Sequence, residues 1–141
     1  MKRGQISIEF ITIFGFIFLM TIPLIIIFFD QSGSVQDSIS ENHLRNIAIK
    51  IIDKAETIYY LGEPSKTTLK VYFPERIDYF NMSAAVGSYS ASIIIGYRTY
   101  RDTLHHIEVA SKVNITGNLS VNPGIHYIEI STTGDGVFIS D

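Results

Sequence analysis

The sequence predicts an α+β fold: a long N-terminal hydrophobic helix continues into an amphipathic helix, and a small antiparallel β sandwich or barrel-like head follows. Three observations support this fold class. From Ile6 to Phe29 the only charged residue is Glu9, apolar residues then recur at helical spacing as far as Gly62, and beyond Pro64 they alternate with a period of two. The boundaries that we expect are a leader at 1–4, a hydrophobic helix at 5–30, an amphipathic stalk helix at 31–62 and a β domain at 66–141.

Size and charge narrow the classes of function. At 141 residues, with about the first thirty so unlike the rest, the chain has room for one small folded domain. Acidic residues outnumber basic ones by 14 to 11, and the basic residues are scattered, so the sequence does not predict a nucleic-acid partner. There is no cysteine, which excludes disulfides and thiolate metal sites but leaves the compartment open.

The hydrophobic segment is long enough to cross a bilayer. As a helix, Ile6–Phe29 would be roughly 36 Å long, against about 30 Å for a hydrocarbon core. A secretory signal peptide has a shorter apolar region and then small residues, whereas this segment ends in two phenylalanines and Asp30, so we do not expect cleavage after it. Because Lys2 and Arg3 precede the segment, the positive-inside rule predicts a cytoplasmic N-terminus and an extracellular position for the residues beyond Asp30.

Glu9 is the residue in this segment that most needs an explanation. A charged carboxylate deep in a bilayer costs on the order of 2.5–3.5 kcal/mol. An isolated Glu at this position could reach the headgroups at the cytoplasmic side. Here, however, it belongs to the stretch MKRGQISIEF, in which a basic leader, Gly4, Gln5, Ser7, Glu9 and an apolar run follow in order. This block resembles the class III signal peptide of archaeal type IV pilin-like proteins.

The resemblance covers residues 1 to about 30 and implies a processing site and an assembly site. It implies that a prepilin peptidase-like membrane protease cuts between Gly4 and Gln5, so that Glu9 and Phe10 become the fifth and sixth residues of the mature chain. In this position the Glu9 carboxylate can pair with the new α-amino group of a neighbouring subunit, which offsets both buried charges. If Gln5 cyclises after cleavage, the amine loses its charge and this pairing is lost.

The same resemblance implies a function. The chain is expected to be a structural subunit, a major or minor pilin, of an archaeal type IV pilus-like surface filament with a role in adhesion. Its partners would be the protease, other pilin subunits of the same or another kind, and the membrane before assembly. It would be a single-pass membrane protein with an extracellular C-terminal domain first, and part of a cell-surface filament afterwards. The alternative is a single-span membrane-anchored extracellular binding module that does not polymerise.

The segment after the hydrophobic run predicts an amphipathic helix with one buried face. Gly62 and Pro64 are expected to end this helix. Ser32-Gly33-Ser34 is either a flexible joint or a weak point within one long helix. The predicted core face consists of Leu44, Ile47, Ile51, Ala55 and Ile58, and the predicted exposed face contains Asn46, Lys50, Asp53 and Thr57.

The β domain is predicted from alternation and turn residues. The clearest strand runs from Val113 to Val121, and Thr133–Gly136 is expected to turn the last hairpin. The other expected strands lie around 69–73, 77–82, 93–95, 104–110, 125–131 and 137–140. Three N-glycosylation acceptors, at Asn81, Asn114 and Asn118, fall in this domain, and the equal parity of the last two predicts that both face solvent.

No motif in the sequence predicts catalysis. His105 and His106 are adjacent in an expected strand, so their side chains should point to opposite faces and not share a metal ion. Glycine-rich phosphate loops, paired metal-ligand motifs and a nucleophile elbow are absent from the sequence. We therefore expect no enzymatic activity, no cofactor and no metal.

Overall fold

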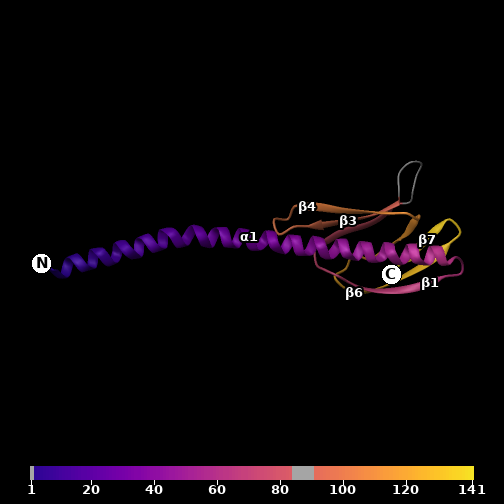
Figure 1. The fold of residues 1–141 in the computed structure, drawn as a ribbon, viewed down its shortest axis with the longest axis horizontal. Coiled ribbons are helices and arrows are strands. Elements are labelled where there is room, and N and C mark those ends of the chain that lie inside the picture. Colours follow the sequence, from indigo (N-terminus) through magenta and orange to yellow (C-terminus); the bar gives the residue numbers. More distant parts are fainter. Residues whose placement is uncertain (1, 84–90) are drawn as a thin grey trace. The chain divides into compact units, whose positions relative to one another are not determined.

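A computed structural model describes the backbone of residues 2–83 and 91–141, and side chains from residue 8 onward within these ranges. The chain divides into two compact parts, residues 1–36 and 37–141. The helix α1 spans Lys2–Leu61 (Figure 1). The strands are β1 (Lys66–Phe73), β2 (Ile77–Ser83), β3 (Ala91–Arg98), β4 (Leu104–Ser111), β5 (Ile115–Asn118), β6 (Gly124–Thr133) and β7 (Gly136–Ser140).

Helix α1 is a single element from Lys2 to Leu61 and includes Pro23. Residues 32–34 are helical, as the interpretation of one long helix requires. The helix ends as predicted: Gly62 has a positive φ of 80° and donates its N–H to the carbonyl of Tyr59 at 3.1 Å. This is the usual use of glycine after the last helical turn, where a left-handed backbone conformation satisfies a free carbonyl.

The predicted amphipathic pattern of α1 is confirmed. All five residues of the predicted core face are buried, and Ala48 and Ile52 join them. The four residues predicted for the opposite face are exposed. The buried helix residues belong to one hydrophobic cluster with residues of every strand, including Phe73, Ile95 and Ile130. The second half of α1 is therefore part of the core of the head.

Within the described residues the strands form a four-stranded sheet, in the order β1-β6-β7-β5, and a three-stranded sheet, in the order β2-β3-β4. The predicted α+β class is confirmed, but the strands of the described ranges do not close into a barrel. All paired strands are antiparallel except β5 and β7, which are parallel, so the expectation of a purely antiparallel head is wrong at this pair. Strands β2 and β5 lie side by side where the two sheets meet.

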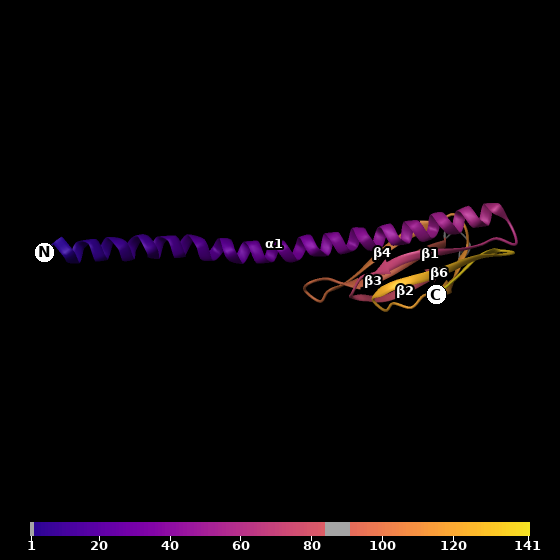
Figure 2. The same ribbon diagram turned by 90° about the horizontal axis from the view of Figure 1, so that it is seen from below.

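The part of α1 beyond residue 37 lies across the opening between the two remaining edge strands, β1 and β4 (Figures 1 and 2). On the β1 side, Nε2 of His43 donates to the carbonyl of Tyr72 at 3.1 Å. On the β4 side, the backbone N–H of Lys112 donates to the carboxylate of Glu56 at 3.2 Å. These bonds satisfy backbone groups that an uncovered sheet edge would leave to solvent or to another chain. The helix thus bonds to backbone groups of β1 and of the residue that follows β4.

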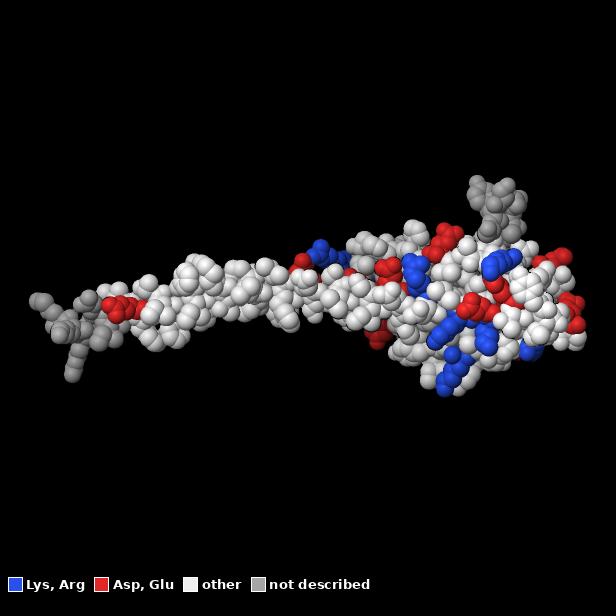
Figure 3. All heavy atoms as spheres, viewed as in Figure 1, with Lys and Arg blue, Asp and Glu red and all other residues white. Residues whose placement is uncertain are grey.

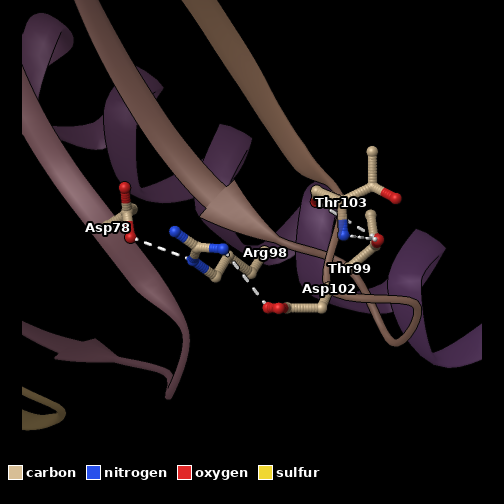
Figure 4. A network of polar contacts seen from close by, with 5 residues as sticks. All are labelled: Asp78, Arg98, Thr99, Asp102 and Thr103. Atoms are coloured by element: carbon tan, nitrogen blue, oxygen red, sulfur yellow. Dashed lines mark hydrogen bonds and ion pairs between the residues drawn. The ribbon is translucent and has the colours of Figure 1, made fainter.

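The loop between β3 and β4 is tied to its surroundings by charged groups (Figure 4). Nε of Arg98 lies 3.1 Å from Asp78 on β2, and its Nη1 lies 3.4 Å from Asp102 within the loop. The hydrogen bond and the charge of Asp78 raise the pKa of the Arg98 guanidinium. The backbone N–H of Tyr100 donates to Asp37 of α1 at 2.6 Å, so the loop is anchored to the helix as well as to the sheet.

The predicted strands are found except for one whose length was wrong. The expected strand from Val113 to Val121 is reduced to β5, which pairs with β7 through Asn118 and Ser140 at its last position. Leu119 is nevertheless buried, so the alternation of apolar residues continues past the last backbone pairing. Alternation reports which side chains reach the core and does not report where a partner strand is available.

Two glycines allow β5 and β7 to approach each other. A Cβ added to Gly117, whose φ is 144°, would lie 1.8 Å from the carbonyl oxygen of Ile139. A Cβ added to Gly136 would lie 2.5 Å from the carbonyl oxygen of Asn114. Both positions require a residue without a side chain, because real Cβ atoms do not come this close to backbone oxygens. The parallel pair depends on these two residues.

Candidate functional site

The first part of α1 presents an apolar surface. Between Ile8 and Phe29 the large apolar side chains are 45–69% exposed. This stretch is about 33 Å long at 1.5 Å per residue, and α1 is long and apolar enough to cross a membrane. On the face seen in Figure 3, charged atoms are absent from the middle of this stretch and gather on the head. A surface of this size and character requires lipid or other apolar helices to cover it.

The hydroxyl groups in this stretch are satisfied within the helix. Thr12 donates its side-chain hydroxyl to the carbonyl of Ile8 at 2.9 Å, and Thr21 donates to the carbonyl of Ile17 at 2.7 Å. Such bonds remove the need for water, so both threonines are compatible with a hydrocarbon environment. Glu9 is exposed on the same stretch and is an acidic residue. Its carboxylate is therefore the group for which an apolar environment is costly.

Phe10 begins an aromatic row along one face of the helix. Its ring centroid lies 4.5 Å from that of Phe14, which lies 6.4 Å from that of Phe18. Residues four apart stack above one another on a helix, so the three rings form a continuous row. The row starts at the residue that follows Glu9. The predicted assembly residues thus lie where a charged group meets an exposed aromatic surface.

The predicted processing residues lie at the start of the helix. Gly4 and Gln5 belong to the backbone of α1, but their side chains lie outside the described residues. Cleavage between them and the pairing of Glu9 with a new amino group stay predictions.

The three sequons differ in their surroundings. Asn81 lies on β2 and Asn118 ends β5, and both are exposed. Asn114 is half-buried and precedes β5, and its side-chain amide donates to the carbonyl of Asp135 at 3.3 Å. Asn114 is therefore less exposed than Asn118, because it lies beside the turn between β6 and β7.

His126 makes contacts that the sequence did not indicate. Its ring stacks on Phe73 with centroids 4.5 Å apart, and its Nδ1 and Nε2 lie 2.5 Å from Asp141 Oδ2 and 2.7 Å from the carbonyl of Asn122. A carboxylate and a carbonyl only accept, so both contacts are hydrogen bonds when the imidazole is protonated and both ring nitrogens donate. Burial disfavours that charge, but the bonds to Asp141 and Asn122 outweigh it and raise the pKa of His126.

This pair makes the stability of the head depend on pH. The pKa of His126 in the folded chain is raised above its ordinary value of about 6.5. The stabilisation of the fold by protonated His126 is therefore complete below about pH 6.5 and is lost as the pH rises through the folded-state pKa. We expect the thermal midpoint of the full chain in detergent to fall by a few degrees between about pH 6 and about pH 9. In Asp141→Asn the fall should be smaller. Equal slopes in both proteins would contradict a charged His126.

The remaining histidines do not assemble a site. His105 and His106 lie on β4, where they pair with Tyr97 and Gly96 respectively. Across the described residues, no group of three or more His, Cys, Asp or Glu is arranged to hold a metal ion. Comparison with protein-family models, with curated proteins and with solved structures found no match.

Proposed function

We propose that the chain is a structural subunit, major or minor, of an archaeal type IV pilus-like surface filament with a role in adhesion. The observation that carries the proposal is the helical surface from Ile8 to Phe29, which is apolar on all sides and has one carboxylate, Glu9, near its start. An amphipathic stripe would suffice to pack a helix on one neighbour. A surface that is apolar all around suits a segment covered by lipid before assembly and by neighbouring helices afterwards.

Glu9 supports the transfer of the helix from lipid into the filament. In lipid its charge is unfavourable by on the order of 2.5–3.5 kcal/mol. Between subunits the carboxylate would pair with the α-amino group that cleavage creates at Gln5 of a neighbour. The free energy of the charged group then falls on leaving the membrane, so assembly is favoured over the free membrane subunit.

Residues 37–61 of α1 and the strands form one compact part with a common core. The buried face of α1 between Leu44 and Ile58 belongs to the same core as the strands, and His43 and Glu56 bond to backbone groups beside it. The segment Leu44–Ile58 of α1 therefore cannot separate from the strands without opening the core.

A membrane-anchored binding module is the second candidate, and one surface favours it. Tyr72, Ile125 and Tyr127 are each more than half exposed on the outer face of the sheet formed by β1 and β6. Exposed apolar side chains in a group are typical of contact surfaces. This function uses the same topology but needs neither cleavage nor polymerisation.

Mass spectrometry of filaments sheared from native cells separates the two candidates. Cyanogen bromide cleaves after Met1 and Met20, so a processed chain releases Gln5–Met20 and an unprocessed chain releases Lys2–Met20. We expect Gln5–Met20 to be abundant in the filament fraction. The matched control is a Gly4→Val chain, in which the processing site is changed. This chain should stay in the membrane fraction and release the peptide Lys2–Met20. Recovery of the native chain solely from the membrane, with Lys2 retained, would support the binding module instead.

A further inference from the structure

The sequons lie on or beside the two strands at which the sheets meet. Asn81 belongs to β2, Asn118 to β5, and Asn114 precedes β5. Strand β2 is an edge strand of the three-stranded sheet, and β5 is an edge strand of the four-stranded sheet. The two strands lie side by side. Glycans on these residues would project from a single line along the head. Their surroundings differ enough to decide which residues can carry one.

Asn118 has the most open position. It is exposed at the end of β5 and pairs with Ser140, and residues 119–123 that follow it belong to no strand. Within the described part of the chain its side-chain amide makes no hydrogen bond, and the same holds for Asn81. Attachment of a sugar to either nitrogen would therefore break no side-chain hydrogen bond within the described residues.

An exposed aromatic ring lies close to Asn118. Phe138 is exposed on β7 and pairs with Thr116, two residues before Asn118 on the same face of β5. Diagonal neighbours on one sheet face are about 8 Å apart, from the spacings of strands and of alternate residues. The first sugars on Asn118 can reach this ring and cover it with their apolar faces. The described chain leaves Phe138 45% exposed.

Asn114 is in the opposite situation. Its side-chain amide donates to Asp135, and its backbone carbonyl accepts from Val137 at 2.8 Å. The residue is half-buried, and its Cβ lies against the position of Gly136. A sugar on this amide nitrogen would replace one of its two hydrogens and require space beside the β6–β7 turn. A bulky polar group belongs on the surface, so this site is unfavourable.

We propose that Asn118 and Asn81 carry N-linked oligosaccharides and that Asn114 does not. The proposal rests on the extracellular position of the head in the proposed function, since the transfer takes place on exported chains. The glycans cover the line between β2 and β5 and leave the outer face of α1 free. They also shield two sheet ends against pairing with other chains.

Glycopeptide mass spectrometry of the full chain purified from native cells tests this assignment. Trypsin releases Asn81 in the peptide Ile77–Arg98, whereas Asn114 and Asn118 share the peptide Val113–Asp141. Electron-transfer fragmentation between residues 114 and 118 then locates the sugar. We expect a glycan mass on each peptide, with the second one on Asn118. Asn118→Gln should lose that mass, Asn81→Gln should lose the other, and Asn114→Gln should retain both.

The outcomes separate this proposal from the filament proposal. A glycan on Asn114, or an unmodified Asn118 or Asn81 in chains that begin at Gln5 and come from sheared filaments, overturns the assignment and leaves the filament role intact. Glycans on Asn118 and Asn81 in a chain that keeps Lys2 and stays in the membrane uphold the assignment and overturn the filament role.

Discussion

Replacing Glu9 by Gln is expected to lower incorporation into filaments by about a hundredfold or more, while insertion into the membrane remains as efficient as in the native chain. Gln is uncharged, so it costs less in lipid than Glu. In the filament, the substitution would leave the α-amino group of Gln5 on a neighbour buried without a partner. Breaking a buried ion pair in this way costs about 3–5 kcal/mol, and each 1.4 kcal/mol is about tenfold in equilibrium.

The measurement is the ratio of chain in sheared filaments to chain in the membrane fraction. Thr12→Val is the matched control: Thr12 is exposed one turn from Glu9, but its hydroxyl bonds to the carbonyl of Ile8 in its own helix. Its loss should leave the ratio unchanged. The mass of the Gln5–Met20 peptide also reports whether Gln5 has cyclised. Normal incorporation of Glu9→Gln, or a cyclised Gln5 in assembled native filaments, would contradict the pairing.

We expect Ile51→Asp to unfold the head. Ile51 is fully buried on the face of α1 that shares the hydrophobic core with the strands. An aspartate there must either bury a charge without a partner or take up a proton, and it also loses the apolar contacts of the isoleucine. Such a change costs more than about 4 kcal/mol, out of a total stability of about 5–15 kcal/mol for a typical domain.

Thermal unfolding of the full chain in detergent, followed through its β-sheet signal, measures this effect. Ile49→Asp is the control because Ile49 lies two residues away on the same helix and is 39% exposed. It should change the midpoint by a few degrees at most. A cooperative transition of Ile51→Asp at the native temperature would show that α1 is not an essential part of the core.

Much of the fold follows from local patterns. The buried face of α1 was predictable because five residues at helical spacing report one environment, and the strand pattern of β1 was predictable for the same reason. The parallel pairing of β5 with β7 was not, since it depends on close approach at Gly117 and Gly136, which a pattern of apolar residues does not encode.

The candidate site divides in a similar way. Glu9 stands out in the sequence because it is a charge inside an apolar run. The difference between Asn114 and Asn118 becomes visible only when the β6–β7 turn is placed beside Asn114. The pairing of His126 with Asp141 joins residues on either side of a hairpin, and neither has a local feature that marks it. Contacts of this kind are set by tertiary packing, so they escape reasoning from spacing.

For the exported subunit that we propose, the position of α1 between β1 and β4 would constrain the order of events during export. The buried face of the helix shares its core with Ile130 on β6 and Ile139 on β7, which follow α1 in the chain and are synthesised after it. In the proposed subunit, the helix would have part of its apolar face in water, beside a membrane that can also cover it, until these strands emerge. Completion of translocation would therefore be the step that moves residues 37–61 from the bilayer surface into the core, and a subunit arrested during synthesis would remain bound at that surface.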